Sequence, residues 1–484
     1  MKSKMFVKLI LSALVFTFMA WLVSCAVNPV TKKREFMLLT ESDEIGLGQQ
    51  TDAQIIQTYG VYQDTNLDAY VDAMGERMGV VTHRPHLNYD YKVLDTPVIN
   101  AFAVPGGFVY VTRGILAYFN NEAELAGVLA HELGHVNARH SAKQYSTATL
   151  AQLGIGLGAV FSETFRKYAG IANFGVSMLF LKFSRDNERE ADALGVEYSS
   201  KIGYDSHEMA KFFETLERLN PSSAQSGLPA WFSTHPNPPD RVQAVLRDTE
   251  KWQQKLTGTN FAVNRNEYLK KLEGMTYGED PRQGYVDGNM FYHPELKFQF
   301  PVPSQWQLNN TPQQVQMFNE SQDAVVIFAL EQGTSPTDAA NAFVTNAQAT
   351  VQKSEQLNVN RMPAHRLISD IQTEQGALRI MSYFIKYSNA IYVFHGYTAA
   401  ANFDTYSSIF NNTMANFKQL TDRSKINVKP AVLRVRTVPS RMTAKKAFLT
   451  FGVPQNDLES MAILNGMQLN DMLPARTLLK VVNK

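Results

Sequence analysis

The chain has 484 residues, which corresponds to about three domains at roughly 150 residues per domain. Its 46 basic and 45 acidic residues nearly balance, so the formal charge is +1, and the chain lacks the positive excess that marks nucleic-acid-binding proteins. Cys25 is the one cysteine of the sequence, which excludes a disulfide within the chain.

Residues 1–25 are typical of an export signal. Three lysines open the segment, an apolar run follows at 9–23, and the tetrapeptide Leu-Val-Ser-Cys ends it at Cys25. This tetrapeptide resembles a bacterial lipobox, in which the cysteine is lipidated and becomes the mature N-terminus. The alternative is an uncleaved membrane anchor with an incidental cysteine. The position of Cys25 favours the lipoprotein, and Ala26 in place of aspartate implies, by the same resemblance, the outer membrane.

The next stretch predicts two helices and a small sheet. Residues 41–79 have a helical pattern that is broken at 59–64. Alternating apolar residues then predict strands at 89–94, 98–104 and 108–112, the last two forming a hairpin. A free strand edge of this kind can hold a peptide by backbone pairing. An ordinary small sheet is the alternative, and the two are compatible.

An apolar run at 124–130 leads into His131-Glu132-Leu-Gly-His135. On a helix the two histidines lie at i and i+4, so both can reach one metal ion. Glu132 points beside that face, where it can hold a water molecule without filling the coordination sphere. This is the zinc-peptidase pattern. The alternative is a surface helix with two solvated histidines.

A catalytic zinc needs a third protein ligand and an open position for water. Residues 183–195 provide a second predicted helix, with Glu188 and Asp192 at i and i+4 among small alanines. We assign Glu188 to the metal, and Asp192 to orienting a ligand histidine through its other ring nitrogen. The alternative is a charged helix face, because three more charged residues lie next to Glu188.

Together, His131-Glu-x-x-His135 and Glu188-x-x-x-Asp192 resemble the gluzincin metallopeptidases of the CAAX prenyl endopeptidase, HtpX and BepA type. Segments beginning at Asn28, Asn100 and Thr234 agree with this family. The resemblance covers roughly residues 28–250. It implies an α+β fold with a mainly helical zincin-type protease domain and a small sheet.

His235 lies in a proline-rich loop, where a lone histidine usually has no chemical role. The resemblance makes it a candidate site residue and implies a switch, in which the imidazole takes the fourth zinc position, displaces the water and leaves the enzyme at rest. A second hypothesis makes His235 a hydrogen-bond donor to the oxyanion. A third makes it a loop residue held by its neighbouring prolines.

Residues 147–183 are mostly apolar and carry Gly-x-Gly-x-Gly at 154–158. Charged residues split the run into pieces of about 14 residues, which are too short to cross a membrane. The glycines lack the preceding strand and the lysine of a nucleotide-binding loop. We expect two helices over the site, either as a lid or membrane-leaning element or as plain core packing.

The composition changes after about residue 275, and an α+β domain similar to PsbP is expected without a catalytic constellation. Its predicted strands lie at 288–303, 324–330, 381–386 and 390–397, and its helices near 337–353 and 404–416. The last block resembles a LysM module, the small βααβ fold that binds glycan chains. Arg441-Met-Thr443 and Pro474-Ala475 depart from the usual Gly-Asp-Thr and Pro-Gly of such modules, which argues for weak peptidoglycan binding.

The expected order is a signal at 1–25, a zinc metallopeptidase domain at 26–275, an α+β domain of unassigned role at 276–424 and the LysM-like module at 425–484. The hypothesis is a lipid-anchored, periplasm-facing endopeptidase that cleaves misfolded or misassembled envelope proteins. It holds one zinc ion per chain, and Glu132 takes a proton from water and passes it to the leaving amine. The competing hypothesis is a chaperone or assembly lipoprotein whose metal site is latent.

Overall fold

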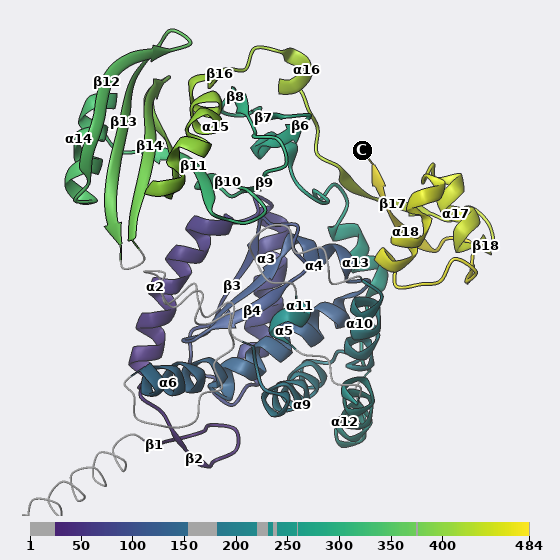
Figure 1. Cartoon of the computed structure of the whole chain (residues 1–484). Coiled ribbons are helices and arrows are strands. Elements are labelled where there is room, and N and C mark those ends of the chain that lie inside the picture. The colour runs from purple at the N-terminus through teal and green to yellow at the C-terminus, as the bar shows by residue number, and fades with distance from the viewer. Residues whose placement is uncertain are drawn as a thin grey trace, which may run out of the picture.

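Figure 1 shows the chain as a computed structural model, in which residues 25–152, 182–219, 231–235, 240–258, 260–373 and 376–483 are described. The export signal at 1–24 and most of the expected helices at 147–183 lie outside the described residues. Helices around a small sheet form the first part of the chain, and broad antiparallel sheets follow it. The fold is therefore mixed α+β, as predicted.

A short hairpin opens the described chain. Strand β1 (Cys25–Val27) pairs with β2 (Arg34–Phe36), and Asn28 holds the turn between them by accepting the backbone N–H groups of Val30 and Thr31. The amide of Asn28 also donates to the carbonyl oxygen of Ala138 at 3.2 Å. The segment that follows Cys25 is therefore fastened to the first helical body.

Two helices and a three-stranded sheet come next, with bounds close to those predicted. A capping box of Thr40 and Asp43 starts α2, and the Asp64 side chain caps α3. The sheet has the order β3-β5-β4, with β3 parallel and β4 antiparallel to β5. These elements are α2 (Glu41–Tyr59), α3 (Thr65–Gly79), β3 (Asp90–Leu94), β4 (Ala101–Val104) and β5 (Phe108–Thr112).

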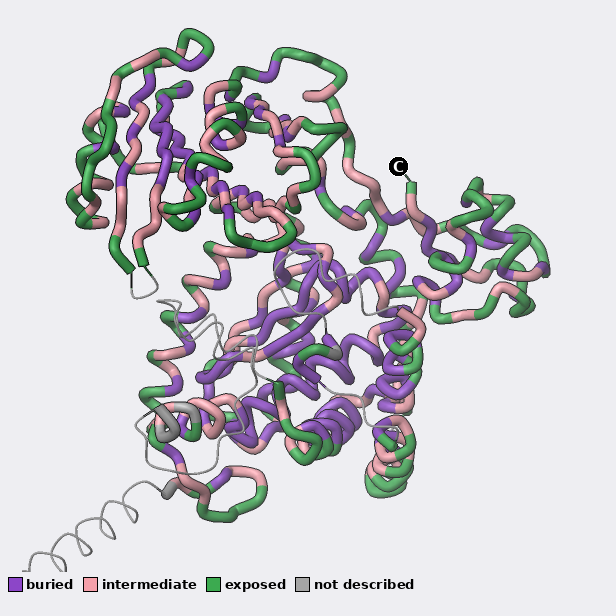
Figure 2. The backbone as a smooth tube through the Cα atoms, in the orientation of Figure 1, coloured by how far each residue is buried: buried purple, intermediate pink, exposed green. Residues whose placement is uncertain are grey.

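Helix α5 (Glu122–Asn137) is the centre of this body, and Figure 2 shows the deep burial around it. Every residue of α5 from 123 to 137 is buried. Burial of each of the three leucines of this helix stabilises the fold by about 1.5–3 kcal/mol relative to an exposed side chain. Helix α9 (Arg185–Lys201) crosses it closely. A Cβ atom at Gly134 would lie only 2.9 Å from the Ala191 carbonyl oxygen, so glycine is needed at this crossing.

Shorter helices complete the first body. They are α4 (Arg113–Tyr118), α6 (His140–Gln152), α10 (His207–Arg218), α11 (Trp231–Thr234), α12 (Arg241–Lys255) and α13 (Arg265–Lys271). Helix α12 packs on both α9 and α10. In the described part of the chain no helix is both long and apolar enough to cross a membrane.

The middle domain contains two antiparallel sheets. One has four strands in the order β16-β8-β7-β6, and the other has seven in the order β12-β13-β14-β15-β11-β10-β9. Their apolar residues form cores separate from the one around α5. The strands are β6 (Tyr285–Asp287), β7 (Met290–His293), β8 (Phe298–Pro301), β9 (Gln307–Asn310), β10 (Gln314–Phe318), β11 (Ala324–Glu331), β12 (Thr350–Val359), β13 (Met362–Thr373), β14 (Gly376–Tyr387), β15 (Ala390–Ala399) and β16 (Lys418–Gln419).

One prediction for this domain is wrong. The helix expected at 337–353 is α14 (Pro336–Asn346), which ends seven residues earlier and is followed by the unpredicted strands β12 and β13. Strand β12 lies at the sheet edge, and its first five residues are exposed. An exposed edge strand carries polar residues on both faces, so its sequence lacks the alternation that marks a half-buried strand. The second helix of the domain is α15 (Phe403–Ala415).

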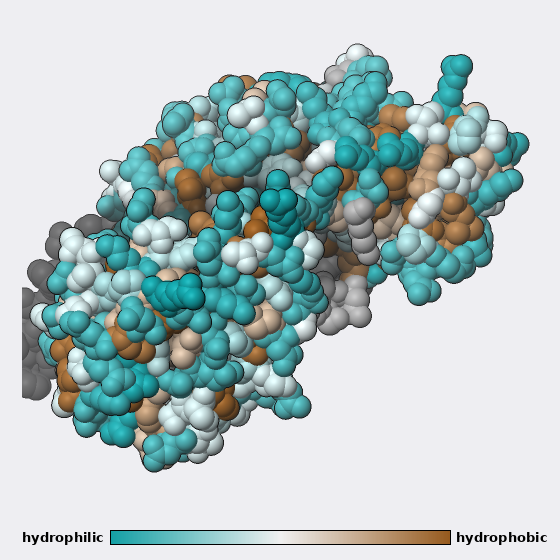
Figure 3. All heavy atoms as spheres, turned by 90° about the horizontal axis from the view of Figure 1, so that it is seen from above, coloured by the Kyte–Doolittle hydropathy of each residue, from teal (hydrophilic) through white to brown (hydrophobic). Residues whose placement is uncertain are grey.

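Residues 432–483 have the predicted order strand, helix, helix, strand. Strands β17 (Val432–Thr437) and β20 (Leu478–Asn483) pair antiparallel around α17 (Ala444–Thr450) and α18 (Leu458–Leu464), with short β18 (Met442–Thr443) and β19 (Met472–Leu473) beside them. Figure 3 shows the whole molecule from above. This face is largely polar, and its apolar residues form small, separate patches.

This C-terminal module shares one hydrophobic core with the first body. Buried residues such as Leu433, Phe448 and Leu479 belong to the same apolar cluster as the leucines of α5. Lys480 is fully buried, and its ammonium group donates to the carbonyl oxygens of Ala117 and Phe119 at 2.7 Å each. The module is therefore built into the body rather than attached by a linker alone.

Candidate metal centre

Helix α5 presents three polar side chains of the His131–His135 motif in a buried position. His131, Glu132 and His135 are each at most 1% exposed. The two histidines lie one helical turn apart, and their Nε2 atoms are 3.1 Å from each other. The surface-helix alternative is therefore wrong, because these imidazoles are withdrawn from solvent.

Helix α9 brings Glu188 to the same point. The hydroxyl of Ser184 caps the start of α9, and Glu188 follows in the first turn of the helix. The carboxylate oxygens of Glu188 lie 3.5 Å from His135 Nε2 and 3.7 Å from His131 Nε2. Because Gly134 permits the close helix crossing, the carboxylate reaches both imidazoles directly.

His235, directly after α11, completes the cluster. Its Nδ1 lies 3.0 Å from Glu188 Oε1 and 3.3 Å from His131 Nε2, and its Nε2 lies 3.7 Å from Glu132 Oε1. The Trp231 ring stacks on the imidazole at 4.2 Å. Burial lowers the pKa of His235, but the two nearby carboxylates outweigh burial and raise it overall.

Asp192, one turn after Glu188, fixes the proton of His131. Its Oδ1 lies 2.9 Å from His131 Nδ1, so that nitrogen carries the proton and donates to the carboxylate. The Nε2 of His131 is then a bare lone pair directed at His135, His235 and Glu188. Each of these four residues offers one ligand atom, and the four atoms lie within 4.8 Å of one another, close enough to surround a single cation.

The donor set fits a zinc ion. Zinc binds imidazole nitrogen and carboxylate oxygen at about 2.0–2.2 Å, which separates tetrahedral ligands by roughly 3.3 Å. The separations around His131 Nε2, His235 Nδ1 and Glu188 range from 3.0 to 3.7 Å. His131, His135, Glu188 and His235 together form a group able to hold a metal ion.

The chain's similarity to known proteins agrees with this geometry. Residues 65–249 match the model of Peptidase family M48. These residues form an M48 peptidase domain. The match confirms the family that the two motifs indicated.

Relatives of the M48 domain include the "putative beta-barrel assembly-enhancing protease" of Vibrio cholerae, which is 31% identical over 42% of this chain and 43% of that protein. The Escherichia coli "beta-barrel assembly-enhancing protease" is 29% identical over the same shares. The "mitochondrial metalloendopeptidase OMA1" of Schizosaccharomyces pombe is 31% identical over 46% of this chain and 65% of that protein. The chain thus spans less than half the length of the bacterial relatives.

The chain also has partial matches among solved structures. The cyanobacterial PsbP of Synechocystis aligns with 28% of this chain and 96% of its own, at 14% identity and a TM-score of 0.24.

Arg241, at the start of α12, supports the carboxylates of the M48 domain. It donates to both oxygens of Asp192 at 2.7 and 2.8 Å, lies 3.2 Å from Glu188 Oε2 and stacks on the Phe213 ring at 4.1 Å. Burial would raise the pKa of Asp192, but the arginine and His131 hold it low. No role had been predicted for Arg241, since only the fold shows that it reaches α9.

Glu132 has a different environment from Glu188. Burial raises the pKa of Glu132, and its Oε1 has no hydrogen-bond partner among the described residues. For Glu188, burial also acts to raise the pKa, but the charges of His235 and His131 hold it well below its usual range. Glu132 therefore holds a proton more strongly than Glu188 does.

His140 and Phe183 also line the M48 site and were not predicted. The Nδ1 of His140 faces the Nδ1 of His135 at 3.0 Å, and its Nε2 lies 3.2 Å from Glu190 Oε2. The Phe183 ring covers His135 at 4.0 Å. His140 lies just past the end of α5, so helical periodicity gave no signal for it.

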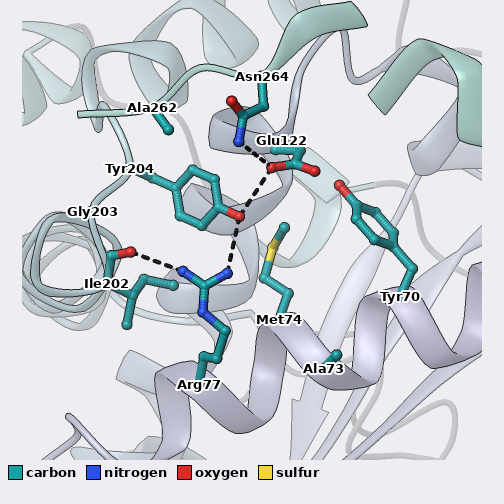
Figure 4. A pocket seen from close by; sticks show the side chains of 10 residues that line it. All are labelled: Tyr70, Ala73, Met74, Arg77, Glu122, Ile202, Gly203, Tyr204, Ala262 and Asn264. Carbon is teal, nitrogen blue, oxygen red and sulfur yellow. Dashed lines mark hydrogen bonds between the residues drawn. The ribbon is translucent and has the colours of Figure 1, made fainter. Parts of the chain in front are cut away.

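A cavity of about 240 Å³ lies behind the start of α5 (Figure 4). Several of its polar side chains bond one another: Tyr204 and Asn264 donate to Glu122, and Arg77 donates to Tyr204 and to the carbonyl oxygen of Ile202. Neither histidine nor cysteine lines it. The hydrogen bonds of its lining residues to Glu122 stabilise the start of α5, and the cavity offers no second set of metal donors.

Proposed function

We propose that the protein is a zinc endopeptidase of the bacterial cell envelope. The observation that carries this proposal is the buried cluster of His131, His135 and Glu188, with the free carboxylate oxygen of Glu132 beside it. Two imidazoles and one carboxylate are the ligand set of many catalytic zinc sites. The M48 family of the domain supports the same activity.

His131, His135 and Glu188 would hold the zinc ion, one per chain. In that position a zinc ion would supply Lewis-acid chemistry: it would polarise the scissile carbonyl group and lower the pKa of a water from about 15.7 toward 7. Glu132 accepts the proton of the attacking water and delivers it to the leaving amine. Its buried position suits this role, because the raised pKa makes its carboxylate a stronger base than one in solvent.

His235 gives the site a resting state in this proposal. With its Nδ1 among the other donors, the set has four members and no place for water. Withdrawal of the 231–235 segment opens the fourth position. The same observation favours the second candidate function, a chaperone or assembly lipoprotein whose metal site stays latent.

The sequence and the relatives support a biological setting for this proposed activity. Lipidation at Cys25 would anchor the protein at the outer membrane, facing the periplasm. Two relatives are named for enhancing β-barrel assembly, which supports misfolded or misassembled envelope proteins as substrates. The C-terminal module, with the βααβ order of a LysM fold, would give weak peptidoglycan affinity.

The test compares three forms of the full chain. Wild type should carry one zinc by elemental analysis and cleave an unfolded envelope protein. Glu132→Gln should keep the zinc and lose proteolysis, because Glu132 is a base and not a ligand. Glu188→Ala should lose both. Equal zinc content in wild type and Glu188→Ala would contradict the ligand assignment, and full activity in Glu132→Gln would favour another function.

A further inference from the structure

His135 makes a contact on the side of its ring that faces away from the metal donors. Its Nδ1 lies 3.0 Å from the Nδ1 of His140, a residue that is 2% exposed. The two rings meet edge to face, with centroids 5.0 Å apart. The far nitrogen of His140, Nε2, lies 3.2 Å from Glu190 Oε2 on α9.

The positions of the protons follow from these contacts. Glu190 is a carboxylate and accepts only, so the Nε2 of His140 carries a proton and donates it. In a neutral imidazole with its proton on Nε2, Nδ1 is bare and can only accept. The facing Nδ1 of His135 must therefore be the donor, and the Nε2 of His135 is left bare toward Glu188.

The opposite arrangement is incompatible with metal binding. If the Nδ1 of His140 carried the proton, the Nδ1 of His135 would be bare and its Nε2 would hold the hydrogen. That hydrogen would point into the space shared with His131 Nε2, only 3.1 Å away, where the metal belongs. Which ring nitrogen of His140 carries the proton thus decides whether His135 can be a ligand.

The two histidines of α5 are oriented by different means. Asp192 accepts directly from His131, whereas the carboxylate of Glu190 acts on His135 through an intervening imidazole. Both carboxylates belong to α9, two and four residues after the metal donor Glu188. The crossing of α5 and α9 therefore brings together both the donor atoms and the groups that orient them.

We propose that His140 is a positioning residue for the metal. It accepts the Nδ1–H of His135, is itself oriented by Glu190, and holds His135 in the tautomer whose Nε2 binds a divalent cation. This inference rests on the proposed zinc site, but it assigns His140 and Glu190 a role beyond the ligands themselves.

The test measures zinc affinity by competition with a chromophoric chelator. His140→Phe fills the same space without an acceptor and should weaken binding by about 10- to 100-fold. His140→Asn keeps an acceptor oxygen at the place of Nδ1 and should bind close to wild type. His207→Phe is the matched control, because His207 lies on α10 and pairs with Asp205; its affinity should be unchanged.

A second measurement reads the tautomer directly. In metal-free protein with ¹⁵N-labelled histidine, NMR should show His135 protonated at Nδ1 in wild type, and an Nε2–H population should appear in His140→Phe. Equal zinc affinity of wild type and His140→Phe, or an Nε2–H on His135 in wild type, would overturn the inference alone. Failure of wild type to bind zinc would instead overturn the proposed function.

Discussion

Replacing Arg241 with methionine should destabilise the metal-free protein strongly. The arginine is fully buried and bonds both oxygens of Asp192, with Glu188 Oε2 at 3.2 Å. Methionine keeps the apolar contact with Phe213 but removes the charge. Two buried carboxylates then lose their cationic partner, and breaking a buried pair in this way costs about 3–5 kcal/mol.

Zinc should reduce this loss. A bound divalent cation compensates the charge of Glu188, so the remaining cost is that of the hydrogen bonds to Asp192, about 1.5–3 kcal/mol. The assay is urea unfolding followed by tryptophan fluorescence, with chelator or with saturating zinc. Arg241→Met should therefore lower the free energy of unfolding more in the metal-free protein than in the zinc-loaded protein.

Arg189→Met is the matched control, since this arginine lies half-exposed on α9 with Asp186 and Asp240 at 3.3 Å. An exposed pair of this kind contributes less than about 1 kcal/mol. Equal losses in the two variants, or a loss at Arg241 that zinc does not reduce, would refute the reasoning that the buried carboxylates need this cation.

Three further predictions address single residues. His235→Ala should raise basal proteolysis because it opens the fourth position; a fall of about 10²-fold with zinc retained would mean that His235 donates to the oxyanion, and no change would make it a loop residue. Asp192→Asn should lower zinc affinity or activity by about 10- to 100-fold, measured on the protein reloaded with zinc. Cys25→Ser should block lipid attachment, and mass spectrometry that finds an unmodified Cys25 in the wild-type chain with an intact N-terminus would contradict the lipoprotein assignment.

Much of the candidate site could be predicted because helix geometry is local. The i and i+4 spacing of His131 and His135 brings their Nε2 atoms within 3.1 Å, and the same spacing joins Glu188 to Asp192. The contact between helices α5 and α9 could also be predicted from the sequence, because a zinc ion needs ligands from both. It could not show that His235 enters the donor set, since that depends on where its loop packs.

The remaining contacts depend on tertiary structure. Arg241 and His140 act through side chains on α9, and no periodicity within their own segments indicates those partners. The same limit applies to Lys480, which lies in strand β20 and contacts carbonyl groups over 360 residues earlier in the chain. Strand β12 was missed because its exposed edge position removes the apolar alternation.

The buried Lys480 has a consequence for the order in which the chain folds. Synthesis proceeds from the N-terminus, and domains generally fold as units as they emerge. The middle domain has its own cores, but the body around α5 lacks part of its core until β20 has been made. The carbonyl groups of Ala117 and Phe119, just before α5, then receive their partner last. The helix that bears the site is thus fully supported only after β20, more than 340 residues further along the chain, has been synthesised.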